Sequence, residues 1–498
     1  MAAIEAVALD LGATSGRVVL GRIGPDRLEL VEVSRFANGG VRLLDALHWD
    51  VLGIYRNFLD GLRRAAAMAQ PASIGVDSWA VDFGLLGADG SLLANPLHYR
   101  DPRFVPVMAE VLGELGADAL YRRGGIQLQA FNTLFQLVEA KRSGRLDGAA
   151  TMLMIPDLLS YWLCGGAAVE RTNASTTQLL RTDGEWDGEL IAALGLPRPL
   201  FPALVDPGGT YGRLSEAVAQ ETGLAMGTKI TAVCSHDTAS AVAAVPAVDD
   251  RFGYISAGTW SLVGLELEAP VCSEESRAAN FTNERGIDGT VRFLRNVTGF
   301  YLLEECLREW SRVAHAPIAL EPLLAEAARC EARRTLIDVD DPELLGPLGV
   351  PGEIAQLCRR RDLPAPSSPA EITRCLLDSL AFAYARHLGA AARLADREIA
   401  TVHLVGGGAR NEVLAQLTAD ATGLPVIAGP VEAAATGNLL VQARALGALR
   451  GDRAELRRLV RAQVPTTTFS PRRAETRAWR ATRSALADER PLSPERLG

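Results

Sequence analysis

One local pattern occurs twice in this sequence, about half the chain apart: an apolar strand, a loop of Gly, Thr and Ser residues, and a second strand. The segments are 4–9, 11–17 and 18–23 in the first copy, and 252–257, 258–261 and 262–267 in the second. A chain of 498 residues is also longer than a single hydrophobic core usually supports. The repeat therefore predicts two domains that are built on one plan and face each other.

The loop of the first copy joins two strands, because a third alternating strand at 28–36 continues an antiparallel meander. Such a loop offers no helix N-terminus to a bound anion, so its own backbone N–H groups must bind the anion. We expect Gly12 and Gly16 to allow a close backbone approach that a Cβ atom would block.

The composition argues against several classes of protein. A net charge of −9 and a pI near 5.4 argue against a nucleic-acid or membrane-surface binder. The seven cysteines are scattered and form no CxxC pair, which favours reduced thiols over a zinc site. The N-terminus is unlike a signal peptide, and no apolar stretch approaches the roughly 20 residues of a membrane span. We therefore expect a cytoplasmic protein with no nucleic-acid or membrane partner.

The second half of the chain contains a strand, a glycine cluster and a helix in succession. We expect a helix at 373–394, a strand at 401–405, a glycine loop at 406–408, a helix at 412–422, a strand at 425–428 and a helix at 432–446. The backbone of such a loop can lie against a planar or phosphorylated ligand, although a single glycine cluster is weak evidence for a nucleotide site. Residues 465–498 are polar and rich in Arg, which predicts a loosely attached tail.

A third feature lies near the middle of the chain. An apolar run ends at Val233, and Ser235, His236 and Asp237 follow before a run of small residues that predicts a helix. Asp237 would lie near the helix N-terminus, which favours the ionised carboxylate, so we expect a fully charged and weakly basic group. On this stretch alone two interpretations stay open: Ser235 or Asp237 simply caps the helix, or the stretch carries chemistry.

Ten segments, in order along the chain, give it a family resemblance. They are 10–17, 48–50, 73–86, 98–101, 125–133, 172–178, 235–242, 256–264, 280–284 and 405–411. From residue 4 to about residue 447 the chain resembles the FGGY carbohydrate kinases, and closely those that act on L-rhamnulose. The resemblance implies an α/β fold with two actin-like ATPase (ribonuclease H-like) domains and a cleft between them.

The resemblance also implies a division of labour and a reaction. Residues 1–246 would bind the sugar and supply the first phosphate loop, residues 247–464 would bind ATP, and residues 465–498 would be the polar tail. The γ-phosphate of MgATP would pass to the C1 hydroxyl of L-rhamnulose, giving L-rhamnulose 1-phosphate. The partners would be a small ketose and MgATP, and the protein would be a monomer or a small homo-oligomer.

The family's site residues carry over to matching positions of this sequence. The nucleotide contacts would be Ala13, Thr14, Ser15, Gly16, Arg17, Thr259, Glu304 and Gly407, and the sugar contacts would be Ala80, His236, Asp237, Thr238 and Asn296. Position 304 is usually glutamine in the family. A carboxylate there is unfavourable for close ATP contact unless Glu304 points away.

The chemistry of phosphoryl transfer assigns roles to three of these side chains. Asp237 would be the general base that accepts the hydroxyl proton. Asp10 would hold Mg²⁺, through a water, unless it is only a turn residue of the hairpin. Arg17 would be a phosphate clamp or a solvated strand residue, two uses that suit arginine equally.

Several alternatives stay open. His236 would donate a hydrogen bond to the sugar or be a core histidine, and Trp79 and Phe83 would form an apolar wall for the sugar methyl group or ordinary core. One methyl is worth only about 1–3 kcal/mol of discrimination, so L-fuculose, L-ribulose or D-xylulose could be the substrate instead. A non-catalytic sugar or nucleotide sensor on the same scaffold is the alternative from another class.

Overall fold

Two large sheets with the same strand plan form the framework of the protein in a computed structural model that describes residues 3–346 and 348–488. The first sheet has the order β11-β12-β6-β1-β2-β3 and the second β15-β16-β14-β13-β17-β18-β19. The strands of the first are β1 (Ile4–Leu11), β2 (Ser15–Gly24), β3 (Arg27–Ala37), β6 (Ser73–Ser78), β11 (Thr210–Arg213) and β12 (Lys229–Thr231). Those of the second are β13 (Phe252–Ala257), β14 (Trp260–Leu267), β15 (Thr282–Arg285), β16 (Val291–Thr298), β17 (Thr401–Val405), β18 (Val426–Ala428) and β19 (Thr467–Phe469).

Five strands of the first sheet have counterparts in the second. In the first sheet β1 runs antiparallel to β2 and parallel to β6, and β12 is parallel to β6 and antiparallel to β11. In the second sheet β13, β14, β17, β18 and β19 repeat these directions in the same order. The prediction of two units built on one plan is confirmed, and the two glycine-bearing hairpins are the turns β1-β2 and β13-β14.

Helices cover both faces of the first sheet, and this explains why β1 is apolar along most of its length. On one face lies α1 (Val51–Met68), whose buried side chains Ile54, Phe58 and Leu62 recur at helical spacing. Its N-cap is Asp50, whose carboxylate accepts the Gly53 N–H at 3.0 Å. On the other face lies α16 (Ala433–Ala445), which comes from the second half of the chain.

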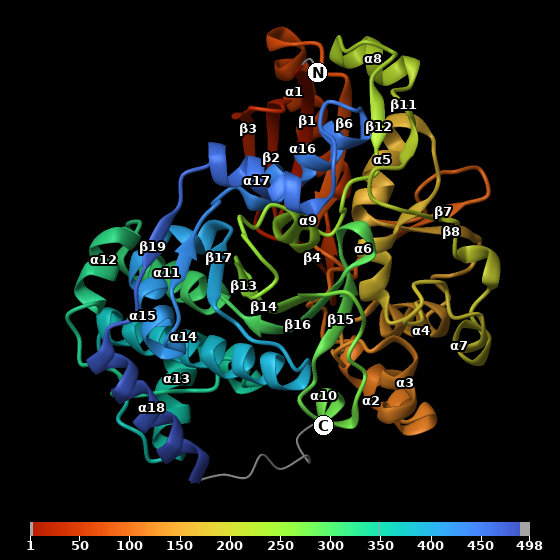
Figure 1. Cartoon of the computed structure of the whole chain (residues 1–498). Helices are drawn as coiled ribbons and strands as arrows, with labels where there is room; N and C mark the ends of the chain where they lie inside the picture. Colours follow the sequence, from red (N-terminus) through yellow and green to blue (C-terminus); the bar gives the residue numbers. More distant parts are fainter. Residues whose placement is uncertain (1–2, 347, 489–498) are drawn as a thin grey trace.

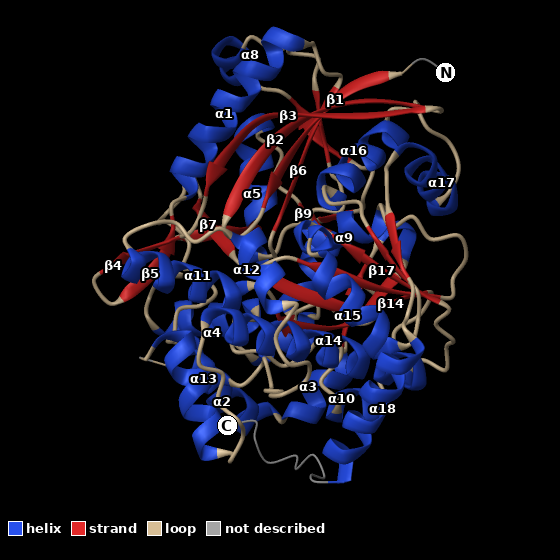
Figure 2. Ribbon diagram, turned by 90° about the vertical axis from the view of Figure 1, so that its left-hand side faces the viewer, coloured by secondary structure: helices blue, strands red, loops and turns tan. Residues whose placement is uncertain are grey.

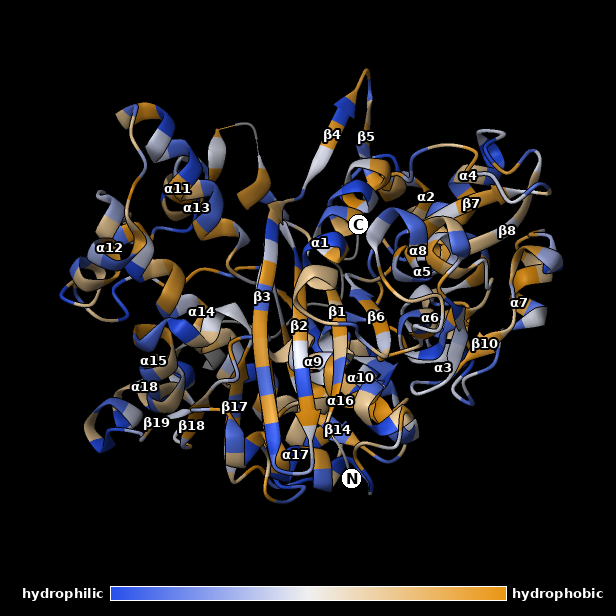
Figure 3. Ribbon diagram, turned by 90° about the horizontal axis from the view of Figure 1, so that it is seen from above, coloured by the Kyte–Doolittle hydropathy of each residue, from blue (hydrophilic) through white to orange (hydrophobic). Residues whose placement is uncertain are grey.

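Smaller elements are inserted between the strands of the first sheet. The hairpin of β4 (Gly40–Leu43) and β5 (Ala46–Trp49) projects from the body of the protein (Figure 3). Residues 83–205 add β7 (Phe83–Gly87), β8 (Ala149–Met154), β9 (Val169–Glu170), β10 (Leu204–Val205), α2 (Phe104–Leu115), α3 (Ala117–Gly124), α4 (Thr133–Arg142), α5 (Ile155–Cys164), α6 (Arg171–Ala174) and α7 (Gly188–Ala193). The short helices α8 (Glu216–Thr222) and α9 (Asp237–Ala243) follow.

The second sheet carries its own helical layer. Its members are α10 (Glu274–Ala278), α11 (Tyr301–Ala314), α12 (Leu320–Ala327), α13 (Gly349–Arg360), α14 (Pro369–Leu394) and α15 (Glu412–Thr422), and the chain continues through α17 (Arg453–Gln463) to α18 (Arg473–Asp488). The long helix α14 has side chains buried on most of its turns because it packs on β14 and β16 and beneath α12 and α15.

The expected loose tail is wrong for residues 467–488. Strand β19 pairs antiparallel with β18 and completes the second sheet, and α18 packs against α15. Trp479 on α18 is fully buried in the core of the second sheet, and the Arg333 guanidinium lies 5.2 Å from its ring. The polar composition predicted a loosely attached tail, but the pairing of β19 and the burial of Trp479 attach the segment to the second sheet. Residues 489–498 of the expected tail lie outside the described residues.

The two halves of the chain exchange helices across the boundary expected at residues 246 and 247. Leu439 of α16 and Leu456 of α17 pack with Ala6 and Val19 of the first sheet. Conversely, Val242 of α9 packs with strands of the second sheet. The division into 1–246 and 247–464 stays a prediction, and these packing contacts cross it.

Within residues 3–346 and 348–488, no helix is long and apolar enough to cross a membrane. The seven cysteines are all free thiols.

Candidate active site

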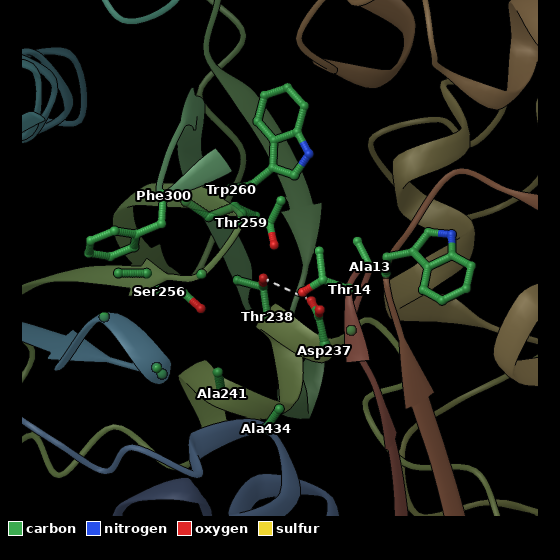
Figure 4. A pocket seen from close by; sticks show the side chains of 18 of the residues that line it. Ala13, Thr14, Asp237, Thr238, Ala241, Ser256, Thr259, Trp260, Phe300 and Ala434 are labelled. Atoms are coloured by element: carbon green, nitrogen blue, oxygen red, sulfur yellow. Dashed lines mark hydrogen bonds between the residues drawn. The ribbon is translucent and has the colours of Figure 1, made fainter. Parts of the chain in front are cut away.

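A cavity of about 860 Å³ opens between the two sheets and receives residues from both. Of the residues expected at the site, those on its surface are Asp10, Ala13, Thr14, Ser15, Arg17, Ala80, His236, Asp237, Thr238, Thr259, Asn296, Glu304 and Gly407. Figure 4 shows Thr14, Asp237, Thr238 and Thr259 pointing toward one another in this space. The structure thus brings together residues that are as far apart as 397 positions in the sequence.

Gly16 is the exception among the expected residues. It is buried in β2 and does not line the cavity, and a Cβ atom there would lie 2.2 Å from the ring of Phe36. Glycine is needed at this position because the Phe36 ring packs against it. The expectation that Gly16 lets a ligand approach the backbone is therefore wrong. Gly12 does line the cavity, and its N–H donates to the Ser15 carbonyl at 2.9 Å, which closes the hairpin loop.

The hairpin register explains the surroundings of Asp10. Asp10 stands opposite Arg17 on β2 and opposite Asp77 on β6. Arg17 donates to the Asp10 carboxylate at 2.5 Å and also pairs with Glu432, just before α16. Burial, and then the charge of Asp10, raise the pKa of the Asp77 carboxyl well above its ordinary value. Asp10 is therefore the cavity-facing member of a buried acidic pair.

Asp237 is the first residue of α9 and does not cap it. The N-cap position is His236, and the Ser235 hydroxyl donates instead to the buried Glu170 carboxylate at 2.9 Å. Both capping interpretations are therefore wrong. Burial raises the pKa of the Asp237 carboxyl, the charge of Asp10 raises it further, and the nearby His236 opposes the shift. The expectation that Asp237 is only weakly basic is therefore wrong. Its pKa is raised, because the loss of water around the carboxyl outweighs the effect of the helix N-terminus.

Thr238 and Asn296 both line the cavity, Thr238 from α9 and Asn296 from β16. The Thr238 hydroxyl donates to the Asp237 carboxylate at 3.1 Å. Asn296 on β16 donates through both its backbone N–H and its side-chain amide to the Gln127 Oε1 atom, at 2.9 and 3.1 Å. The Gln127 Nε2 atom is buried and has no hydrogen-bond partner among the described residues. Gln127 was missed as a site residue, although its run of polar amides at 126–133 was a usable signal.

An aromatic wall closes one side of the cavity. Trp79 and Tyr99 line it from the first half of the chain, and Trp260 lines it from β14, with its indole N–H donating to the Tyr99 hydroxyl at 3.2 Å. Phe131 packs edge-on against Trp260 with ring centres 5.5 Å apart. Phe83 lies elsewhere, in the core beneath β8 and α5, so its expected place in a sugar-facing wall is wrong.

The wall depends on Asp82, which is fully buried. Its carboxylate accepts the indole N–H groups of Trp49 and Trp79 at 2.6 and 3.0 Å, the Tyr99 N–H at 3.2 Å and the Gln136 amide at 2.8 Å. Burial nevertheless raises the pKa of Asp82 to about 7, against these four donors. Asp82 therefore fixes the orientation of the wall from behind.

A cation from the first half of the chain lies beside aromatic rings of the second half at the edge of this wall. The Arg100 guanidinium lies 3.8 Å from the ring centre of Tyr301 on α11 and 5.1 Å from that of Trp260. Arg100 itself follows Tyr99 in the first half of the chain. This cation–π contact joins the two halves beside the cavity, where such contacts gain from partial desolvation.

The glycine loop after β17 forms the opposite end of the cavity. Gly406 has φ of +81°, and a Cβ atom on Gly408 would lie 2.5 Å from Ala257. Gly407, in contrast, has no heavy atom within 4 Å of its Cβ position. Glu304 also lines this end from the first turn of α11, and burial raises the pKa of its carboxyl. Gly407 therefore leaves its backbone open to a ligand, whereas its two neighbours serve the fold.

Comparison with known proteins defines the class of this site. The chain belongs to the FGGY family of carbohydrate kinases: residues 6–244 match the family's N-terminal domain and residues 253–446 its C-terminal domain. It is a sugar kinase, a phosphotransferase whose family uses ATP. The expected α/β fold with two actin-like domains and a cleft is confirmed.

Among curated relatives, the chain is similar to rhamnulokinases. It is 42% identical over 478 residues to rhamnulokinase from Bacteroides thetaiotaomicron, covering 95% of this chain and 97% of that protein. It is 37% identical over 467 residues to rhamnulokinase from Bacillus subtilis, covering 93% and 95%.

Solved structures agree in fold. Gluconate kinase from Lactobacillus acidophilus superposes with a TM-score of 0.80 at 17% identity, covering 99% of each chain. Plasmodium falciparum glycerol kinase with ADP gives a TM-score of 0.78 at 16% identity, covering 98% of each chain.

Replacing Asp82 should change how stability depends on pH. The folded wild type keeps the Asp82 proton up to about pH 7, whereas an unfolded carboxyl loses it near pH 4, so raising the pH through this window destabilises the fold. Asp82→Asn has no such proton. Its free energy of unfolding relative to wild type should therefore rise by about 2–3 kcal/mol between about pH 5 and about pH 8. Denaturant unfolding at several pH values measures this, with exposed Asp45→Asn as the control. A difference that does not vary with pH would contradict the assignment.

Proposed function

We propose that this sugar kinase transfers the γ-phosphate of MgATP to the C1 hydroxyl of L-rhamnulose, giving L-rhamnulose 1-phosphate and ADP, with Asp237 as general base. The observation that carries the proposal is that Asp237 shares one cavity with the hairpin loops of both sheets. Identity of about 40% to rhamnulokinases over more than nine-tenths of the chain supports this choice of sugar.

The chemical step needs one proton acceptor and one leaving group. As the sugar oxygen forms its bond to the γ-phosphorus, its proton passes to the Asp237 carboxylate. The bond from the γ-phosphorus to the bridging oxygen breaks, and its electron pair leaves with ADP. The raised pKa of Asp237 supports this role, because a partly desolvated carboxylate accepts a proton more readily than an exposed one.

The phosphates would lie between the two hairpins. Ala13, Thr14 and Ser15 would offer backbone N–H groups from the first loop, and Thr259 would do so from the second. Arg17 would turn from its acidic partners to clamp a phosphate oxygen. Gly407 would bind the adenosine side through its open backbone.

Glu304 also fits a place beside the nucleotide. Its raised pKa moves it toward the neutral acid, which can donate a hydrogen bond as the glutamine usual in the family does. The direction of this shift weakens the objection that a charged carboxylate would repel the phosphates.

Mg²⁺ would neutralise charge on the β- and γ-phosphates when it is bound. Asp10 would hold it through a water, since its carboxylate faces the cavity and is an oxygen donor of the kind Mg²⁺ prefers. Within the described ranges no three His, Cys, Asp or Glu side chains gather as a metal site. Water and phosphate oxygens would therefore supply most ligands, which is the usual pattern for Mg²⁺.

The sugar would lie against the aromatic wall. His236, Thr238 and Asn296 would bind its hydroxyl groups and Ala80 would contact it from the end of β6, while Trp79 would cover the 6-deoxy methyl group. Three expectations stay predictions: that the protein is cytoplasmic, that it is a monomer or small homo-oligomer, and that it has no nucleic-acid or membrane partner.

The variant Asp237→Asn tests the general base. An amide keeps the shape of the side chain but cannot accept the proton, so turnover should fall by about 10²–10⁴-fold while both substrates still bind. Steady-state kinetics measure turnover, and isothermal titration with the sugar and a non-hydrolysable ATP analogue measures binding. Asp118→Asn, in the first turn of α3, is the matched control. Near-normal turnover by Asp237→Asn would exclude it as the base.

The sugar assignment has its own test. An ADP-release assay should give the highest kcat/KM with L-rhamnulose among L-rhamnulose, L-fuculose, L-ribulose and D-xylulose. The advantage over a ketose that differs by one methyl should be about 10- to 200-fold. A higher kcat/KM with any of the other three sugars would reassign the substrate.

A further inference from the structure

The segment 280–284 resembles the family but has no role in the chemistry described so far. Its last residue, Glu284 on β15, stands directly opposite Arg292 on β16. The two form an ion pair at 3.0 Å with 5% and 0% of their side chains exposed. Buried ion pairs lose much of their Coulombic gain to desolvation, so a buried pair at this position calls for a further reason.

Both members of the pair contact the ring of His236. The Arg292 guanidinium lies 3.0 Å from the His236 Nδ1 atom, and the Glu284 carboxylate lies 3.3 Å from the same atom. On the other side of the ring, His236 Nε2 lies 3.5 Å from the Asp237 carboxylate. The ion pair comes from the second sheet and His236 follows the last strands of the first, so the three residues bridge the two halves.

These contacts favour one arrangement of protons in a neutral ring, because the shorter contact of Nδ1 is with the Arg292 guanidinium. Arginine has no acceptor, so its contact with Nδ1 requires that Nδ1 be unprotonated and accept. The proton of a neutral imidazole then lies on Nε2, where it faces the Asp237 carboxylate and the cavity. The opposite tautomer would place the Nε2 lone pair against the Asp237 carboxylate and the Nδ1 proton against the guanidinium, which are two repulsive contacts. It would gain only the longer contact of Nδ1 with the Glu284 carboxylate, at 3.3 Å.

Arg292 also balances the charges around the ring. The charged groups that face His236 are Asp237 from α9, Glu284 from β15 and Arg292 from β16. Although burial opposes ionisation of Glu284, the charge of Arg292 holds its pKa below the ordinary value. Without Arg292 the ring would lie between two carboxylates, and a second proton would satisfy both.

We propose that the buried Glu284–Arg292 pair positions His236 as the neutral tautomer with its proton on Nε2, so that the ring donates toward the sugar and the general base. The proposal rests on the proposed function, since it deepens the account of the same site. Glu284 and Arg292 are positioning residues that act through His236. Keeping His236 uncharged also keeps Asp237 a good proton acceptor, because an imidazolium at this distance would favour the ionised carboxylate.

Nitrogen-15 NMR of the histidine rings tests the proposal without any substrate. The chain has six histidines, and the His236 signals are assigned by their loss in His236→Gln. In the wild type near neutral pH, the His236 ring should show a protonated Nε2 and an unprotonated Nδ1. A ring that is protonated on Nδ1, or on both nitrogens, would overturn the proposal by itself.

Three variants separate positioning from mere stability. Arg292→Met should give a doubly protonated His236 ring and lower kcat by about 10- to 100-fold, with the KM for ATP unchanged. Arg292→Lys keeps a donor and a charge, and should keep the neutral ring. The double variant Arg292→Met with Glu284→Gln removes both charges, and should return the ring to neutrality and recover part of kcat.

A second buried pair provides the matched control. Arg457 on α17 pairs with Glu266 on β14 at 2.8 Å, with 6% and 4% of the side chains exposed, away from the cavity. Arg457→Met should lower stability without changing the His236 signals or kcat. Equal effects of Arg292→Met and Arg457→Met on kcat would reduce the Glu284–Arg292 pair to a structural role.

The two proposals fail in different ways. If the wild type phosphorylates no ketose while the Nε2-protonated ring is present, the proposed function fails and the tautomer assignment stands. If Arg292→Met does not fold, the wild-type and Arg292→Lys spectra still decide, because a neutral, Nε2-protonated ring is required in both.

Discussion

The close crossing of two helices holds the rest of this structure in place. Helix α9 begins at Asp237 and α16 comes from the far end of the chain, and they approach so closely that a Cβ atom on Gly437 would lie 1.8 Å from the Ser240 carbonyl oxygen. Each helix packs on the sheet of the opposite half. Because of this crossing the start of α9 lies between the sheets, and the two glycine hairpins meet around a single carboxylate.

The crossing also supplies partners for buried charge. Asn438 on α16 donates to the Asp77 carboxylate at 2.6 Å, and Glu432, just before α16, pairs with Arg17. On the far side of the cavity, Arg292 and Glu284 approach His236 from the second sheet. Several buried polar groups of the first half are thus paired with side chains of the second, so the two halves depend on each other electrostatically as well as through packing.

Much of this arrangement could be predicted from local signals. The spacing of apolar residues placed α15 at 412–422 and β17 at 401–405, and both bounds agree with the structure. The doubled hairpin indicated two similar units. The resemblance of ten segments to the FGGY family predicted the site residues, and nearly all of them line the cavity. Each of these inferences used neighbours in the sequence or a motif of known meaning.

The features that could not be predicted depend on contacts between residues far apart in the sequence, and no local pattern reveals such contacts. The pKa of Asp237 was expected to fall because its helix was visible in the sequence while its burial was not. Residues 467–469 were taken as part of a tail because their partner strand lies about 40 residues away.

The central claim, transfer to a primary hydroxyl beside Asp237, is tested most directly by proton-coupled phosphorus-31 NMR of the product. Coupling of the phosphate to the two protons of a methylene carbon is the predicted result, and coupling to a single methine proton, or release of inorganic phosphate alone, would contradict it.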